Sequence, residues 1–454
     1  MRSELQDNAG VEPFLDVGLA EAKALADTHE TPLFVYDEAY FTERIRDFFA
    51  VWKRHFSGGE VYLSYKTNYM PRLCRIAHEI GLGADVVSGY ELEHAIKLKA
   101  TDRAVFNGPL KRVTELRRAA IAGVGINVDL KEELVALQHL RDAGDIPEPR
   151  LGIRVNPGRA VYASKDPSFI TAHQARQGSG KFGWPLDDDL AEHVADTIKQ
   201  AGFALRMVHT HLNSQITRPE LMLDALRPVL AFVRKLVDRG TPIDEVNIGG
   251  GFGVSGMVRT KRGWWAELKH VMNEPIPHET AEEFDLESFC SALQSELAAF
   301  RLESLRVSCE PGRFLFSPSC ALLTRVVGIK HLRSKTWLIV DAGLHIMPTA
   351  SFGEKRRLRF LSPDKGEMHA GDDAMECALG GPLCYEGDVL MHEIRAPRDI
   401  AAGDLVLISD AGAYTVSRST NFNQPRAAVA MRDTRDGRLI WRREAYDDIF
   451  RYAE

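Results

Sequence analysis

Eight short apolar runs of this sequence each end in residues that could do chemistry. In chain order those residues are Lys66, Asp85, Asn107, Asp129, Arg154, His211, the glycines Gly249, Gly250 and Gly251, and Glu310. A lysine amine can attack an aldehyde to form a Schiff base, and a carboxylate favours a cation placed beside it. Each residue alone has a simpler explanation, since a strand-end lysine is usually solvated and an aspartate before a helix often caps it. The coincidence of eight polar strand ends predicts a shared site.

The glycine run lies in the stretch VNIGGGFGV, residues 246–254. Glycines let backbone N–H groups approach an anion closely, although many glycine runs are simply flexible turns. Arg313 in CEPGRF and Ser214 in HTHLNSQ add a guanidinium and a hydroxyl near neighbouring strand ends, and both groups suit a phosphate. A phosphate-bearing aldehyde such as pyridoxal phosphate would use the lysine, the anion cradle and the carboxylate together.

The elements that must position these residues alternate between strand and helix. Runs such as EVYLSYK and GADVVS are each followed by a segment of helical periodicity, and the pattern repeats over residues 37–312. Such alternation implies parallel strands with right-handed crossovers. Eight units predict an α/β fold, a closed (β/α)₈ TIM barrel, whose functional groups gather at the C-terminal strand ends. A doubly wound open sheet is the alternative.

The remainder of the chain has a different character. Residues 313–454 contain short β-like runs such as TWLIVDAG and DLVLISDAG, separated by turn residues and without helical periodicity between them. We expect a β-rich C-terminal domain, a β-barrel or sandwich, that also takes residues 1–36.

The composition is that of an ordinary globular protein, with 454 residues, 44% hydrophobic and 27% charged, and a net charge of −7. No basic half indicates nucleic-acid binding, and no apolar run is long enough for a membrane span. Six scattered cysteines without a C-x-x-C pair favour reduced thiols, so we expect a cytoplasmic protein. His209 and His211 share one face of a strand, but no third ligand is evident nearby and we expect no metal site.

Many motifs resemble those of the alanine-racemase-fold pyridoxal-phosphate decarboxylases, the group that includes diaminopimelate and ornithine decarboxylases. YKTN resembles the family's cofactor-lysine motif, and further motifs follow in the family's order: ADVVSGYELEHA, FNGPLK, RVNP, HTHLNSQ, NIGGGFG, EPGRF, VDAG, GPLCYEGD and DAGAYTVSRSTNFN. The resemblance covers nearly the whole chain. It implies a barrel followed by a β-domain, pyridoxal 5'-phosphate as cofactor, α-decarboxylation of an amino acid, and a homodimer with shared active sites.

The same resemblance assigns roles to the matched positions. Lys66 would bind the cofactor aldehyde with Asp85 nearby, His211 would stack on the cofactor ring, and Glu310 would bind the ring nitrogen. The phosphate would be held by Ser214, Gly249, Gly250, Gly251, Gly312, Arg313 and Tyr414. Cys384 of the neighbouring subunit, or water, would return a proton to the product carbon. The residues expected at the substrate are Asp388, Tyr385 and His345.

Two departures from the family pattern put diaminopimelate in doubt as the substrate. Diaminopimelate decarboxylases carry an arginine shortly after VDAG that binds a substrate carboxylate, whereas VDAGLHIMPTASFG, residues 340–353, contains none. Tyr385 replaces the glutamate that follows the motif cysteine, and Glu386 comes one residue later. Both stretches look more like the family's biosynthetic branch, which serves natural products or siderophores, some of whose members act on substrates tethered to a carrier protein.

The substrate is therefore open between a free diamino or acidic amino acid and an aminoacyl group on an acyl carrier protein. An insertion at 255–280, with Trp264 and Trp265, is either a lid or docking surface for such a carrier or a surface embellishment. A racemase of this fold is the enzymatic alternative, but it would place an arginine at the ring nitrogen. A catalytically silent cofactor-binding or regulatory homologue is the non-enzymatic alternative, against which Lys66, Glu310 and Cys384 together argue.

Overall fold

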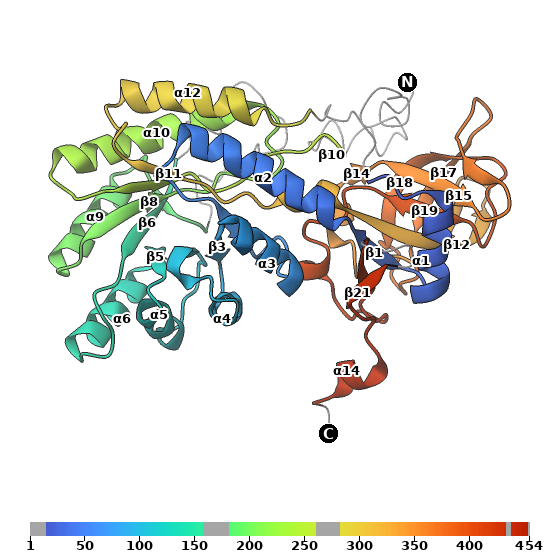
Figure 1. Ribbon diagram of the computed structural model, residues 1–454, viewed down its shortest axis with the longest axis horizontal. Coiled ribbons are helices and arrows are strands. Elements are labelled where there is room, and N and C mark those ends of the chain that lie inside the picture. The colour runs from blue at the N-terminus through green and yellow to red at the C-terminus, as the bar shows by residue number, and fades with distance from the viewer. Residues whose placement is uncertain (1–14, 158–180, 260–281, 433–436, 453–454) are drawn as a thin grey trace.

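The computed structural model describes residues 15–157, 181–259, 282–432 and 437–452. Two parts lie side by side in Figure 1: strands surrounded by helices on the left, and a β-rich part on the right. Residues 260–280 of the 255–280 insertion, among them Trp264 and Trp265, lie outside the described residues. None of the described helices is both long and apolar enough to cross a membrane.

Eight parallel strands form the first part. They are β2 (Tyr62–Ser64), β3 (Gly83–Val86), β4 (Ala104–Phe106), β5 (Gly125–Val128), β6 (Leu151–Asn156), β8 (Leu205–His209), β9 (Glu245–Asn247) and β11 (Arg306–Ser308), and each pairs with the next. The last strand also meets the first, because the N–H of Tyr62 donates to the carbonyl of Cys309 at 2.8 Å and that of Cys309 donates to Glu60 at 3.0 Å. The sheet therefore closes on itself, which confirms the predicted barrel over the open sheet.

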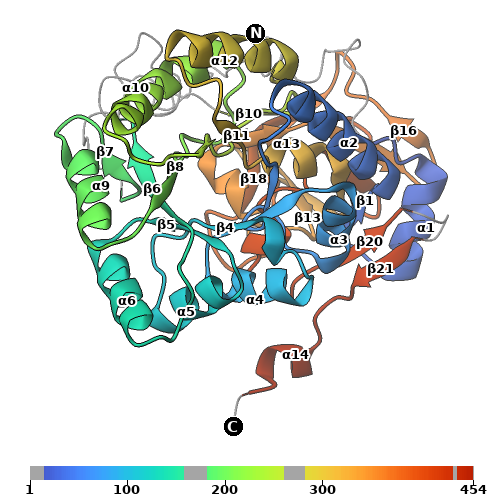
Figure 2. The same ribbon diagram turned by 60° about the vertical axis from the view of Figure 1, so that its left-hand side comes forward.

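Figure 2 shows helices arranged around these strands. They are α2 (Glu38–His55), α3 (Pro71–Ile80), α4 (Gly89–Lys97), α5 (Val113–Ile121), α6 (Lys131–Asp142), α9 (Leu190–Gln200), α10 (Pro219–Asp238) and α12 (Leu286–Ala299). In α2 the buried side chains recur every three to four residues, as packing on a sheet requires: Phe41, Ile45, Phe48 and Trp52. Asp37 caps this helix by accepting from the N–H of Tyr40 at 2.9 Å.

The β-rich part is built around a ten-stranded sheet. Its strands are β1 (Leu33–Tyr36), β12 (Cys320–His331), β13 (Thr336–Val340), β15 (Leu358–Ser362), β16 (Gly366–Met368), β17 (Met375–Gly380), β18 (Val389–Ala396), β19 (Leu405–Ile408), β20 (Ala428–Met431) and β21 (Arg438–Trp441). The N-terminal strand β1 lies between β12 and β20. We propose the division of the chain into 37–312 and 1–36 plus 313–454 on these pairings. The helix α1 (Leu19–His29) packs on this sheet, and α14 (Tyr446–Phe450) projects from it (Figure 1).

Two connections bring the β-rich part to the barrel mouth. The strand β10 (Met257–Arg259), which follows the glycine run, pairs antiparallel with β14 (Glu354–Arg356). After β19 the chain turns back to the barrel, where the N–H of Tyr414 donates to the carbonyl of Thr67 at 3.0 Å. Residues of both parts therefore surround the C-terminal ends of the barrel strands. The short helix α13 (Arg313–Phe316) leads from one part into the other.

Candidate active site

Lys66 and Asp85 meet at the C-terminal ends of two adjacent strands. Because Ser64 of β2 pairs with Asp85 of β3, the lysine two residues later reaches the carboxylate, and Nζ lies 2.5 Å from Oδ2. Asp85 is fully buried and also accepts from Ser64 Oγ at 2.9 Å and from Asn107 Nδ2 at 2.8 Å. Burial opposes the charge on Lys66, but the carboxylates of Asp85 and Glu310 raise its pKa above the ordinary value.

Glu310 occupies the strand end beside β11, where one of its oxygens is crowded with donors. Oε1 accepts from Asn107 Nδ2 at 2.6 Å and from Asn247 Nδ2 at 2.8 Å, and His209 Nε2 lies 3.1 Å away. The other oxygen, Oε2, is buried and has no hydrogen-bond partner among the described residues. A buried carboxylate oxygen without a donor is costly, so this atom is poised for a donor on a ligand.

The charge on Glu310 is set by its surroundings. Burial alone would favour the neutral acid, but the imidazole of His209 and the ammonium of Lys66 hold the pKa of Glu310 well below its usual range. Glu310 is therefore ionised at neutral pH. A ligand that places a protonated ring nitrogen at Oε2 would find a matching charge there.

His211 presents a neutral ring between the glycine run and Glu310. The N–H of Gly250 donates to His211 Nδ1 at 3.0 Å, which leaves the proton of the neutral imidazole on Nε2. Burial lowers the pKa of His211 below its ordinary value. A neutral, flat imidazole suits stacking on a ring better than it suits pairing with an anion.

The residues expected to hold a phosphate lie together. Arg313 Nε donates to Ser214 Oγ at 3.0 Å, and the guanidinium carbon of Arg313 lies 5.1 Å from the centre of the Tyr414 ring. Gly250 packs directly against a neighbouring strand end, since a Cβ there would lie 2.3 Å from the carbonyl oxygen of Glu310. Gly249 and Gly251 have φ values of +70° and +111°, which strongly favour glycine, and Gly312 lies against Thr67 Oγ1.

Arg313 is oriented by Glu354, a residue that the sequence does not single out. Arg313 Nη2 donates to Glu354 Oε1 at 3.0 Å, and Arg356 Nη2 donates to the other oxygen, Oε2, at 2.8 Å. All three side chains are buried. Glu354 enters the site only because β14 pairs with β10, a contact between distant segments that no local pattern reveals.

Three other polar strand ends form one wall of the mouth. Arg154 Nη1 donates to the carbonyl of Asn107 at 3.1 Å and lies 3.8 Å from Asp129 Oδ2. Asp129 Oδ1 in turn accepts from the N–H of Gly183 at 2.7 Å. Asp129 and Arg154 therefore pair with each other and fix the neighbouring backbone of Asn107 and Gly183. The side chain of Asn107 links Asp85 to Glu310.

Within the described part of the chain, the residues expected at the substrate make no hydrogen bond or ion pair to the side chains of Lys66, Asp85 or Glu310. Cys384 and Tyr385 are exposed on the loop after β17. Asp388 is buried, and its carboxylate accepts from the N–H groups of Leu344 at 2.7 Å and Leu383 at 2.8 Å. His345 is also buried, and burial lowers its pKa to about 4. Asp388 thus ties two loops together, whereas Cys384 stands at the surface.

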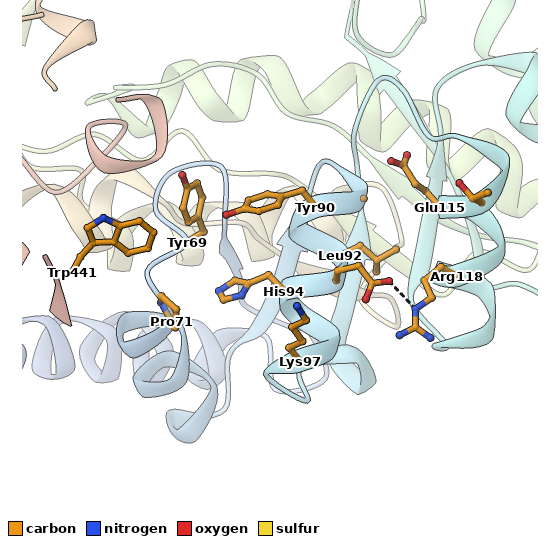
Figure 3. Close-up of a pocket in the computed structure, with 12 residues that line it drawn as sticks. Tyr69, Pro71, Tyr90, Leu92, His94, Lys97, Glu115, Arg118 and Trp441 are labelled. Carbon is orange, nitrogen blue, oxygen red and sulfur yellow. Dashed lines mark hydrogen bonds and ion pairs between the residues drawn. The ribbon is translucent and has the colours of Figure 1, made fainter. Parts of the chain in front are cut away.

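A cavity of about 720 Å³ lies outside this cluster, over α3, α4 and α5. Figure 3 shows Tyr69, Tyr90 and Trp441 along it and Arg118 toward its far end. Arg118 Nε donates to Glu93 Oε1 at 2.8 Å. None of the residues expected to bind cofactor or substrate lines it. The candidate active site is therefore identified by its side chains and not by this cavity.

Glu91, beneath the Asp85 strand, makes the stability of the protein depend on pH. It is buried and accepts from the N–H of Val87 at 2.8 Å, and burial raises its pKa to about 7. Since the folded state then binds the proton more tightly than the unfolded state, this group's contribution is fully present below about pH 4.5 and is lost as pH rises through 7. Relative to wild type, Glu91→Gln should therefore stabilise the protein more at pH 8 than at pH 4. We expect the gain in unfolding free energy to be larger at pH 8 by on the order of 2 kcal/mol. Urea titrations at both pH values measure this, and equal effects at the two pH values would contradict it.

The chain is similar to known proteins in sequence and in fold. The family model described as pyridoxal-dependent decarboxylase, pyridoxal binding domain, matches residues 42–317, more than half of the chain. Diaminopimelate decarboxylase of Aquifex aeolicus is 29% identical over 433 residues, 94% of this chain and 92% of that protein. The enzyme of the same name from Methanothermobacter thermautotrophicus is 28% identical over 446 residues, 96% of this chain and 94% of that protein.

Solved structures show the same likeness. The crystal structure of diaminopimelate decarboxylase from Helicobacter pylori complexed with L-lysine is 25% identical, with a TM-score of 0.74, and the match covers 94% of this chain and 98% of that one. The structure of diaminopimelate decarboxylase from M. jannaschii is also 25% identical, with a TM-score of 0.76 over 95% of this chain and 93% of that one.

The residues present fit pyridoxal phosphate. The unpartnered Glu310 Oε2 would meet the ring nitrogen, and the joined side chains of Ser214 and Arg313 would bind the phosphate. Lys66 would meet the aldehyde. The chain belongs to the pyridoxal-dependent decarboxylase family, and it is an amino-acid carboxy-lyase that uses pyridoxal phosphate.

Proposed function

We propose that the protein removes the α-carboxylate of a free amino acid of the diaminopimelate class, which carries a second amino group and a far carboxylate. The relatives named diaminopimelate decarboxylase support this, because they match the chain over more than nine-tenths of both lengths. A substrate tethered to a carrier has weaker support, because the similar Helicobacter pylori structure is complexed with L-lysine. The cytoplasmic location stays a prediction, in keeping with six free cysteines.

The observation that carries the proposal is Glu310, which is ionised, buried and short of one donor. Pyridoxal phosphate supplies an electron sink for the pair of electrons left when carbon dioxide departs, and the sink is stronger when its ring nitrogen is protonated. A carboxylate favours that protonated form, whereas the arginine of a racemase does not. Glu310 therefore favours decarboxylation over racemisation.

The other residues of the site have separate tasks. Asp85 pairs with Lys66 Nζ at 2.5 Å and so holds the lysine at its strand end. The neutral ring of His211 would cover one face of the cofactor ring, with its orientation held by Gly250. Arg313 and Ser214 would bind the phosphate as a preassembled pair.

Glu354 is expected to contribute most to stability in the apoprotein, where no cofactor phosphate offsets the positive charges of Arg313 and Arg356. Glu354→Gln leaves Arg313 and Arg356 buried without their shared carboxylate, so we expect a loss of about 1–3 kcal/mol in the unfolding free energy of the apoprotein. The loss should shrink in saturating pyridoxal phosphate, whose phosphate supplies negative charge. Denaturant titrations with and without cofactor measure both values.

The matched control for that experiment is Glu367→Gln, which removes a more exposed carboxylate paired with Arg359. An exposed pair contributes little, so this control should change the unfolding free energy by less than about 1 kcal/mol. If Glu354→Gln is no more destabilising than the control, Glu354 does not orient Arg313.

We further propose a homodimer in which Cys384 of one subunit completes the site of the other, because Cys384 is exposed on its own subunit. The test mixes two inactive variants, Lys66→Ala and Cys384→Ala. Random exchange of subunits would restore one intact site in each hybrid and recover about a quarter of the wild-type activity. Recovery of no activity after exchange, with hybrids confirmed by mass, would contradict shared sites.

The substrate is tested by carbon dioxide release from a panel of amino acids. Meso-diaminopimelate, lysine, ornithine and arginine differ in length and in whether a far carboxylate is present. The proposal predicts the highest kcat/KM for diaminopimelate. Preference for ornithine or arginine would place the chain in another branch of the family.

A further inference from the structure

A loop of the β-rich part, residues 414–420, is clamped onto the backbone around Lys66. The N–H of Tyr414 donates to the carbonyl of Thr67 at 3.0 Å. Ser417 Oγ lies 3.0 Å from the carbonyl oxygen of Lys66 and 2.9 Å from that of Thr67. Arg418 follows Ser417 directly, so the contact between Ser417 and the backbone of Lys66 also fixes the position of the Arg418 backbone.

The side chain of Arg418 lies against the loop from which an arginine is missing. Its guanidinium carbon is 5.1 Å from the centre of the Phe352 ring. Phe352 ends η3 (Pro348–Phe352), within the stretch 340–353 that carries a carboxylate-binding arginine in diaminopimelate decarboxylases and carries none here. The N–H of Thr420 donates to the carbonyl of His345 at 2.8 Å, which holds the two loops together.

Arg418 is available to a ligand. It is exposed, and no carboxylate pairs with its guanidinium anywhere in the described part of the chain. An arginine stays charged at every physiological pH and presents a planar fork that binds a carboxylate through two parallel hydrogen bonds. Phe352 is 41% exposed and offers an apolar face beside that fork. Cation and ring together suit a chain of methylene groups that ends in a carboxylate.

We propose that Arg418 binds the carboxylate at the far end of the substrate and thereby sets the preference for amino acids that carry one. Phe352 covers the methylene groups between the two ends. The inference rests on the proposed function, because it places the reacting end of the substrate at Lys66. It accounts for how a chain without the family's arginine would still recognise a far carboxylate.

The test compares diaminopimelate with cadaverine, which has the same two amino groups on the same carbon chain but no carboxylate. The variant Arg418→Met removes the charge and keeps most of the length. We expect kcat/KM for diaminopimelate to fall by roughly 10–100-fold, as for the loss of a charged hydrogen bond, while the inhibition constant of cadaverine changes by less than about twofold. Arg418→Lys should recover part of the loss. Arg333→Met, in the turn between β12 and β13, is the control and should change neither value.

The absorbance band of the bound cofactor is recorded for every variant. If the band and cadaverine inhibition persist in Arg418→Met but diaminopimelate turnover is not selectively lost, the Arg418 inference is wrong and the decarboxylase function stands. An equal loss of diaminopimelate turnover and of cadaverine affinity would likewise contradict a role at the far carboxylate. If the wild type binds no cofactor and releases no carbon dioxide, the proposed function itself fails and the inference fails with it.

Discussion

Replacing Lys66 with arginine is expected to lower kcat/KM for decarboxylation by roughly 10⁴-fold or more, the scale seen when a covalent catalyst is removed. Arginine keeps the positive charge that Asp85 pairs with at 2.5 Å, so the fold around the strand end should persist. A guanidinium does not form the Schiff base that the amine forms. Initial rates of carbon dioxide release measure the loss.

The control for this variant is structural. The thermal midpoint of Lys66→Arg should lie within a few degrees of the wild-type value, because the buried carboxylate of Asp85 remains paired. Activity within tenfold of wild type in a preparation free of wild-type protein would show that Lys66 is not the covalent group. A collapse of the midpoint would instead call for Lys66→Gln as a second variant.

Replacing Glu310 with glutamine is expected to lower kcat by roughly 10³-fold, the cost of removing one preorganised charge from an active site. Glutamine has nearly the same volume, and its amide oxygen can still accept from Asn107 and Asn247. What disappears is the negative charge at the oxygen that lacks a donor. The ring nitrogen of the cofactor would then lose its protonated form, and the electron sink would weaken.

A conservative variant distinguishes this chemical role from a packing role. Glu310→Asp keeps the charge on a shorter side chain and should recover part of the lost kcat, whereas a site that needs only volume would be damaged more by aspartate than by glutamine. Cofactor content, measured after release in alkali, should stay near one per chain in both variants. A fully active Glu310→Gln enzyme would remove the main argument for a decarboxylase over a racemase.

The barrel could be predicted because each of its strands and helices carries a local signal. The stretch DEAYFTERIRDFFAVWKRHF predicts a helix, and the structure places α2 at Glu38–His55. The runs EVYLSYK and GADVVS predict strands, and β2 and β3 lie within them. Strand-end positions follow from these elements, which is why Lys66, Asp85 and Glu310 could be expected at one mouth before any contact was known.

What the sequence did not reveal depends on contacts between distant segments. The strands β16 and β17 were not predicted, since GEM is short and MECALG has no alternation of apolar and polar residues. Asn247 and His209 act on Glu310 through the curvature of the barrel, and Glu354 reaches Arg313 only through the pairing of β10 with β14. Asn247 had one available signal, its place at a strand end directly before the glycine motif.

Lys66 lies at its strand end to meet the aldehyde of pyridoxal phosphate, and borohydride reduction tests this role. The absorbance of the purified protein is recorded before and after borohydride, and the peptide that carries Lys66 is then weighed by mass spectrometry. We expect a Schiff-base band that bleaches on reduction and a pyridoxyl adduct on Lys66. A protein with no band and no adduct, even after pyridoxal phosphate is added, would contradict it.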